Sequence, residues 1–225
     1  LAVVPHSGRG RYVRCAMSML RGRTVTEGLF DSSSLARVVR QWSRETRYDA
    51  VLASSSGVAR YVFPPCVNAD TKRWVDLIDV DSQKWLDYAN ASRFPMSLVY
   101  RTEGRRLRNV ECRLAASCDR LLVVSEAERE LFRSFCPTDR IAAVSNGVDH
   151  QYFAPQQDIV SERHSCVFVG VMNYKPNTDA AIWFAENVWP QIRQRYPDAK
   201  FTIVGKSPTP EVQALQARNG IEVTG

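Results

Sequence analysis

Two loops in the last third of the sequence carry glycine and lysine residues of the kind that bind phosphate. In "VGVMNYKPNTDAA", Gly170 ends a strand-like run and Asn177 could cap the next helix, with Lys175 nearby. A helix N-terminus attracts anions, and a lysine adds to that attraction. The second loop, "VGKSPTP", repeats the arrangement with Gly205 and Lys206. We predict a diphosphate site here. Ordinary capped helices are the alternative, because neither loop has a G-x-G-x-x-G or P-loop motif.

Two acidic residues in "DLIDVDSQKW" form the second group that could do chemistry. Asp79 and Asp81 share a side of a predicted extended segment at the end of a strand. Their carboxylates could accept hydrogen bonds from sugar or alcohol hydroxyls, or hold Mg²⁺ or Mn²⁺. Acids are equally favoured just ahead of a helix. We therefore expect an acidic strand end and no metal site.

The composition excludes several other kinds of chemistry. With 225 residues, 44% hydrophobic and 24% charged, the chain has the composition of a folded, soluble protein. Its six cysteines form no C-x-x-C pair, and its three histidines lie outside any catalytic or metal motif, which leaves little support for zinc or histidine-based chemistry. No run reaches the roughly 18 apolar residues of a membrane span. We expect isolated thiols in a reducing cytoplasm.

The net charge of +6 is suited to phosphate-bearing or membrane-surface partners. The densest basic cluster runs from Arg101 to Arg113, where Glu103 and Glu111 interrupt it as they would on a solvated helix face. We predict a solvated face and no nucleic-acid partner. Peripheral contact of this basic helix with an anionic membrane is the alternative.

Helices and strands that alternate along the chain must position these residues. In the first part, one apolar stripe follows the helical period from Leu35 to Trp42. The predicted elements are a helix over 33–47, a strand from Ala50 to Ala53, a short helix over 58–63, a strand over 75–80, a long helix from Pro95 to Ser117, a helix that Ser125 opens through a capping box with Glu128, and a strand from Ile141 to Val144.

The same alternation restarts after residue 163. It predicts a strand over 166–172, one helix over 178–197, a strand over 200–205, a helix over 211–220 and a strand over 221–224. Trp183 and Trp189 are expected in the core, because a tryptophan buries a large area. Strict strand and helix alternation implies an α/β fold with two parallel sheets, each covered on both faces.

The turn "VSNGVDHQYFAP" separates the two alternating parts. Asn146 and Gly147 favour a sharp turn, while Pro155 discourages a continuing helix or strand. We predict an N-terminal domain over 1–145, a linker over 146–163 with Asn146, Gly147 and Asp149 as hinge residues, and a second domain over 164–225. A plain surface loop is the alternative. The leading Leu1 and the strand-like ending indicate a fragment, so both domains are expected to be truncated.

Several of these stretches together resemble glycosyltransferase family 4. The turn above, followed by "VFVGVMNYKPNTDAAIWFAENVWPQIRQRYPDAKFTIVGKSPTPEVQAL", is most similar to a bacterial subgroup of sugar transferases associated with exopolysaccharide and PEP-CTERM gene clusters. "TVTEGLFDS", "LIDVDSQKW" and "LLVVSEAERELF" resemble its N-terminal domain. The resemblance implies the GT-B fold, in which two Rossmann-like domains face each other across a cleft. It also implies transfer from a nucleotide sugar with retention of configuration.

The resemblance also implies roles for particular residues. The loop from Gly170 through Asn173 and Tyr174 to Asn177 would lie beside the donor diphosphate, and Gly205 with Lys206 beside the nucleotide. Asp79 and Asp81 would lie on the acceptor side, where many members have a histidine. Two features depart from the family: that histidine is absent, and so are the phosphate-binding Arg and Lys after Gly170, where Lys175 is the only cation. The paired glutamates that contact the donor sugar would lie beyond Gly225, so the catalytic residues are unknown.

The leading hypothesis is a cytoplasmic glycosyltransferase, working at the inner face of the membrane on a glycan or lipid-linked acceptor. Its donor would be a UDP- or GDP-sugar, a substrate rather than a cofactor, and no cofactor is expected. The 225-residue piece alone should have little or no activity, because both ends of the site would be missing. A sugar-nucleotide epimerase of the same fold, or a non-catalytic domain that binds a nucleotide or a protein partner, are the other hypotheses.

Overall fold

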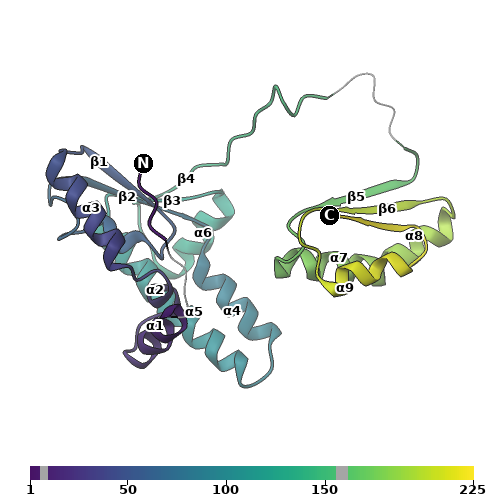
Figure 1. Ribbon diagram of the computed structural model, residues 1–225, viewed down its shortest axis with the longest axis horizontal. Coiled ribbons are helices and arrows are strands. Elements are labelled where there is room, and N and C mark those ends of the chain that lie inside the picture. Colours follow the sequence, from purple (N-terminus) through teal and green to yellow (C-terminus); the bar gives the residue numbers. More distant parts are fainter. Residues whose placement is uncertain (6–9, 156–161) are drawn as a thin grey trace. The chain divides into compact units, whose positions relative to one another are not determined.

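The chain forms two compact units, each built around its own parallel sheet (Figure 1). The computed structural model describes residues 1–5, 10–155 and 162–225. The first unit comprises Leu1–Val148 and the second Asp149–Gly225. All pairs of neighbouring strands in both sheets are parallel. The predicted fold class, α/β with two Rossmann-like units whose parallel sheets are flanked by helices, is confirmed.

Unit 1 contains a four-stranded sheet in the order β1-β2-β3-β4. Its elements are α1 (Gly10–Leu20), α2 (Val25–Leu29), α3 (Ser33–Glu45), β1 (Ala50–Ser54), the 3-10 helix η1 (Ala59–Val62), β2 (Lys72–Ile78), α4 (Asp81–Ala91), α5 (Met96–Ser117), β3 (Arg120–Val123), α6 (Glu126–Phe135) and β4 (Ile141–Ala143). The central strands contribute Val75 and Leu121 to the core, where they meet Leu107 of α5 and Phe132 of α6. The long helix predicted from Pro95 to Ser117 is confirmed, with Pro95 as its N-cap.

Two glutamates of α5 are buried, contrary to the prediction that they lie on a solvated face. Glu103 is 3% exposed and Glu111 is fully buried. Glu111 accepts hydrogen bonds from the backbone N–H of Ser82, at 2.9 Å, and from its hydroxyl, at 2.5 Å. Glu103 accepts from the N–H groups of Val25, at 2.7 Å, and Thr26, at 3.0 Å. The reason for the error is that each carboxylate satisfies N–H groups that a helix start leaves unpaired, at α4 and at α2.

The first turn of α4 is secured by a second carboxylate. Ser125 caps α6 as predicted, and its hydroxyl accepts from the N–H of Glu128 at 3.2 Å. The other half of the predicted capping box is not the contact that forms. The carboxylate of Glu128 accepts instead from the N–H of Val80, the N-cap residue of α4, at 2.7 Å. A tertiary contact therefore replaces the local one, and α4 is tied to both α5 and α6.

Unit 2 contains a three-stranded sheet in the order β5-β6-β7. Its elements are β5 (Ser165–Val169), α7 (Lys175–Asn187), α8 (Trp189–Arg195), β6 (Lys200–Val204), α9 (Pro210–Ala214), the 3-10 helix η2 (Leu215–Ala217) and β7 (Ile221–Thr224). The single helix predicted over 178–197 is wrong, because Pro190 cannot continue the backbone hydrogen bonds of α7 and a new helix begins at Trp189. Trp189 is buried as predicted, but Trp183 is 59% exposed.

Helices cover only one face of the sheets over much of their area, whereas the sequence predicted cover on both faces. Within the described residues of unit 2, Figure 1 shows α7, α8 and α9 on the same side of the strands, and Val167 and Val169 of β5 are exposed. In unit 1, the paired residues Leu52 and Trp74 are exposed. The strands follow one another in order across each sheet, so right-handed crossovers bring successive helices to the same face.

Burial raises the pKa of the Glu111 carboxyl from 4.5 to about 7, against the lowering effect of its hydrogen bonds from Ser82. Folding therefore takes up a proton at this site between these two pH values. The stability that Glu111 contributes is fully present below pH 4.5 and is lost as the pH rises through about 7.

We expect Glu111→Gln to flatten the pH dependence of unfolding. The wild-type protein should lose about 2.5 kcal/mol from this group between about pH 5 and 8, because each pKa unit corresponds to about 1.4 kcal/mol. Urea unfolding at several pH values would measure the difference between the two proteins. Glu45→Gln, which changes an exposed glutamate of α3, is the control and should keep the wild-type slope. Equal slopes for the wild type and Glu111→Gln would contradict the assignment.

Candidate functional site

Three glycines lie side by side at the carboxyl ends of the strands of unit 2. Gly170 follows β5, Gly205 follows β6 and Gly225 follows β7. A Cβ atom added to Gly205 would lie 1.6 Å from the carbonyl oxygen of Gly170, and one added to Gly225 would lie 2.0 Å from that of Gly205. The backbones thus touch where any side chain would clash. This edge of the sheet, which we call the glycine edge, presents bare main chain.

The two predicted loops are joined to each other by hydrogen bonds. The N–H of Gly170 donates to the carbonyl of Val204, and the N–H of Met172 donates to that of Lys206, both at 3.0 Å. Met172 is fully buried, so it anchors the loop in the core of unit 2. The structure therefore brings Gly170, Gly205 and Lys206 together, as the sequence predicted for two neighbouring loops.

The start of α7 differs from the prediction. The helix begins at Lys175 with Tyr174 as its N-cap, so Asn177 lies inside the first turn and does not cap it. Its side chain fills the space beside Gly170 and donates from Nδ2 to the carbonyl of Val171 at 3.2 Å. The N–H groups of Asn177 and Thr178 both donate to the carbonyl of Tyr174. These two donors are already used within the turn, and Pro176 has no N–H to offer.

The two predicted lysines have different surroundings. The ammonium group of Lys175 pairs with the Asp179 carboxylate one turn along α7, at 2.8 Å. Lys206 is exposed and makes no ion pair with any residue that the structure describes. Asn173 and Tyr174 are also exposed in the loop between β5 and α7. Of the two lysines, Lys206 is therefore the better placed to bind an anionic ligand beside the glycine edge.

The two predicted acids lie at the carboxyl end of β2 in unit 1, but not on one side of an extended segment. Ile78 has φ of +68°, which turns the chain immediately before Asp79. Asp79 is exposed, whereas Asp81 is the first residue of α4 and is partly buried. The hydroxyl of Ser56 donates to Asp81 Oδ2 at 3.1 Å. Burial raises the pKa of the Asp81 carboxyl, and the hydrogen bond from Ser56 opposes that rise.

Two residues at the same strand ends have backbone conformations of the left-handed region. Ser55 has φ of +89° just after β1, and Ile78 has φ of +68° at the end of β2. Both are conformations that side chains disfavour, most of all a β-branched one, and such strain occurs often at functional sites. The N–H of Ser55 donates to the carbonyl of Asp76, and that residue's carboxylate accepts from the N–H of Ile78. The sequence analysis missed Ser55 and Ser56, for which the run "SSSG" is the available signal.

The predicted hinge residues Asn146, Gly147 and Asp149 are exposed and lie near the division between the two units. The carboxylate of Asp149 accepts hydrogen bonds from the N–H groups of Gln151 and Tyr152, which closes a local turn. The predicted linker, 146–163, includes residues 156–161, which lie outside the described residues.

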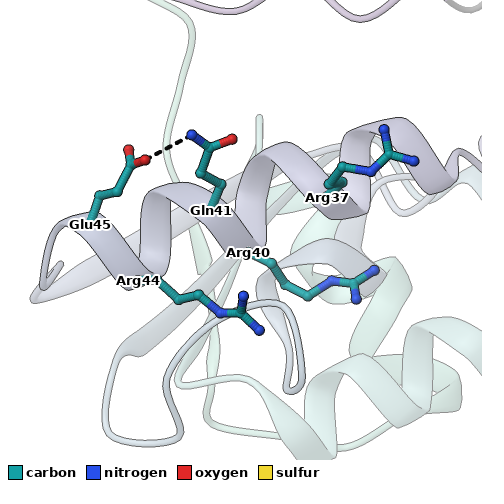
Figure 2. A pocket seen from close by; sticks show the side chains of 5 residues that line it. All are labelled: Arg37, Arg40, Gln41, Arg44 and Glu45. Carbon is teal, nitrogen blue, oxygen red and sulfur yellow. Dashed lines mark hydrogen bonds between the residues drawn. The ribbon is translucent and has the colours of Figure 1, made fainter.

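Two hollows of unit 1 are lined by residues of α3. Figure 2 shows a depression formed by side chains of α3 alone, in which Arg40 and Arg44 extend to one side while Gln41 donates to Glu45 at 2.7 Å on the other. A cavity of about 600 Å³ lies between α3 and β1. It is lined mostly by apolar side chains, among them Leu35, Val39, Trp42 and Val51. An apolar lining is poorly suited to a phosphate or a sugar.

In residues 1–5, 10–155 and 162–225, no three His, Cys, Asp or Glu side chains are grouped so that they could hold a metal ion. Over the same residues, every helix is too short or too polar to cross a bilayer.

Comparison with known families and structures gives two findings. Residues 163–225 match the family model described as glycosyl transferases group 1, so the matched segment contains the whole glycine edge. The fold is similar to that of the crystal structure of TarM, with a TM-score of 0.59 and 13% sequence identity. That likeness covers 87% of this chain and 36% of TarM. It agrees with the GT-B fold class predicted from the sequence.

A second crystal structure, of a mutant S. aureus TarM in complex with fondaparinux, alpha-GlcNAc-glycerol and UDP, gives a TM-score of 0.57 at 13% identity. The likeness covers 85% of this chain and 36% of that one. The chain thus spans little more than a third of the length of the solved structures that it resembles. No curated protein sequence matches it.

We expect Gly205→Ala to destabilise unit 2 by about 3 kcal/mol or more, because the new methyl group would overlap the carbonyl of Gly170 and the backbone of Gly205 has φ of +153°. Gly147→Ala is the matched control. A Cβ at Gly147 meets no atom within 4 Å, so the cost should stay within about 0.5 kcal/mol. Denaturant unfolding measures both changes, and similar stabilities for the two variants would show that the glycine edge is not tightly packed.

Proposed function

We propose that the whole protein containing this chain is a retaining glycosyltransferase of family 4, in the subgroup associated with exopolysaccharide and PEP-CTERM gene clusters. It would transfer a hexose from a UDP- or GDP-sugar to a glycan or lipid-linked acceptor at the cytoplasmic face of the membrane. One observation carries the proposal. The segment that matches glycosyl transferases group 1 contains the glycine edge, where bare backbone lies beside the exposed Lys206.

In this proposal, unit 2 binds the donor. When the bond between the sugar and the diphosphate breaks, negative charge develops on the departing diphosphate. Gly170 and Gly205 have no side chains of their own and are partly exposed, so a diphosphate could lie against this edge of the sheet. Asn177 and the neighbouring backbone already fill the space beside the two glycines, so the positive charge for the phosphate would come from Lys206. The ammonium group of Lys206 would neutralise part of the developing charge, and fixed positive groups of this kind lower the barrier to reaction. Asn173 and Tyr174 would line the same loop. The proposal requires neither a metal ion nor a separate cofactor.

Unit 1 would bind the acceptor at the ends of β1 and β2. Asp79 is exposed there and could accept a hydrogen bond from an acceptor hydroxyl. Asp81 is held by Ser56 at 3.1 Å, so we assign it a positioning role in the strained loop. Holding the two substrates in a fixed geometry accounts for a large part of catalysis in reactions of this kind.

We expect Lys206→Ala in the full-length protein to weaken nucleotide-sugar binding about tenfold or more, because it removes a hydrogen bond to a charged group. Lys175→Ala should weaken it by about threefold or less, since Asp179 already pairs with that lysine. Titration calorimetry with UDP- and GDP-sugars would measure both effects. UDP is the first nucleotide to test, because it is present in the S. aureus TarM complex.

Lys200→Ala provides the matched control for the loss of one positive charge. Lys200 begins β6, at the opposite end of the strand from Gly205, and pairs with Glu162 at 3.2 Å. Its loss should change affinity by no more than about twofold. Equal weakening by Lys200→Ala and Lys206→Ala would exclude a donor site at the glycine edge. Failure of the wild-type protein to bind any nucleotide sugar would contradict the proposed function itself.

A further inference from the structure

Helix α1 turns its apolar side to solvent. Tyr12, Val13, Met17 and Leu20 lie on one face of the helix, and each is between 42% and 83% exposed. The polar residue Ser18 lies on the opposite face and is buried, and its hydroxyl donates to the carbonyl of Thr24 at 2.7 Å. This is the reverse of the usual arrangement, in which the apolar stripe of a surface helix packs on the core.

The exposure does not result from a loosely attached helix. A Cβ added to Gly28 of α2 would lie 2.7 Å from the carbonyl oxygen of Arg14 and from Cβ of Ser18, so α1 and α2 are packed backbone against backbone. The guanidinium group of Arg106, on α5, donates to the carbonyls of Met19 and Arg23, each at 3.0 Å. α1 is therefore held in this orientation by polar contacts on its inner side.

The turn between α4 and α5, taken together with the first residues of α5, carries a second exposed apolar group, consisting of Phe94, Met96 and Leu98. Phe94 is 80% exposed. In Figure 1, α1 and this turn lie at the end of unit 1 away from its sheet, and Arg106 joins α1 to the same helix α5. We call the two groups together the basal surface. Exposed groups of large apolar side chains commonly mark a contact with a protein or a membrane.

Arginines surround both apolar groups, and acidic residues are absent nearby in the sequence. The first 26 residues contain no Asp or Glu, and neither does the stretch between Asp87 and Glu103. The exposed arginines of these segments are Arg11, Arg21, Arg93 and Arg101. None of them forms an ion pair with the described part of the chain. Asp31 lines the same hollow as Val13, Met17 and Arg21, but its carboxylate pairs with Arg60 at 3.0 Å. The basal surface therefore combines apolar side chains with arginines that have no ion pair among the described residues.

The combination of exposed apolar side chains and arginines favours one kind of partner. Two copies of the chain meeting through the same surface would bring arginine against arginine, which opposes a symmetric dimer. An anionic phospholipid bilayer complements both properties, because its headgroups attract arginine and its acyl boundary accepts apolar side chains. The basic face of α3 in Figure 2 is lined by charged and polar side chains, while the exposed Trp42 of the same helix lines the cavity beside β1.

We propose that the basal surface, formed by α1 and the α4–α5 turn, docks the protein on an anionic phospholipid bilayer. Tyr12, Met17, Leu20 and Phe94 enter the interface, and the surrounding arginines contact lipid headgroups. This differs from the sequence-based alternative, which assigned membrane contact to the basic helix from Arg101 to Arg113. Two residues of that helix, Arg106 and Arg108, bond to groups within unit 1. The proposal does not depend on sugar transfer.

Sedimentation of the full-length protein with lipid vesicles tests this. The protein should bind vesicles of phosphatidylcholine containing about one third phosphatidylglycerol, and bind pure phosphatidylcholine at least about tenfold more weakly. The variant Tyr12→Ser, Met17→Gln, Leu20→Ser should lose at least about tenfold in affinity for the anionic vesicles. Its circular dichroism spectrum should be unchanged, because these side chains are exposed. Hydrogen exchange in residues 10–20 of the wild type should slow when vesicles are added.

Arg40→Gln with Arg44→Gln is the matched control. It removes two positive charges from α3 and should alter vesicle binding by no more than about twofold. Three results would overturn the proposal: no binding of the wild type to anionic vesicles, wild-type affinity in the triple variant, or equal weakening by the α3 variant. A change in oligomeric state of the triple variant by light scattering, with vesicle binding intact, would assign the surface to a second copy and also overturn it.

Discussion

The arrangement of unit 1 depends on carboxylates that are buried at the starts of helices. A helix N-terminus leaves N–H groups without partners, and burying them unpaired would be costly. Glu111 supplies the acceptor for Ser82 at the start of α4, and Glu103 does the same for α2. Glu128 adds a third carboxylate at Val80. The partial positive charge of each helix start favours the charged carboxylate, but at Glu111 burial outweighs this effect and raises the pKa to about 7.

This constraint connects two surfaces that are far apart in the sequence. Asp81 is the first residue of α4, so its position beside Ser56 follows from the way Glu111 and Glu128 hold that helix start. Glu103 fixes α2, against which α1 packs, and Arg106 of the same helix α5 holds the end of α1. The acidic strand end and the basal surface are thus both positioned by α5. In the proposed enzyme, one rigid helix would set the acceptor site relative to the membrane.

Unit 2 is packed in a different way, and no charged side chain is buried among its described residues. Its glycine edge is defined by the absence of side chains, since the backbones of Gly170 and Gly205 lie in contact. The buried Met172 and the side chain of Asn177 hold the first loop against the second. Such an edge is rigid because it is close-packed, and the exposed Lys206 beside it is suited to an anionic group. A transferase that relies on positioning would need both properties.

The sequence alone determined the fold class, the long helix α5 and the two glycine loops, because periodicity and turn residues act locally. It could not reveal that Glu103 and Glu111 are buried, because their partners Val25 and Ser82 lie 78 and 29 residues away. It also misassigned Asn177 as a cap, although the contacts of that side chain with Gly170 and Val171 are local. The direction of the apolar face of α1 was decided only by packing against α2 and α5. A helical pattern shows that a face is apolar, whereas the tertiary structure decides whether protein or solvent lies against it.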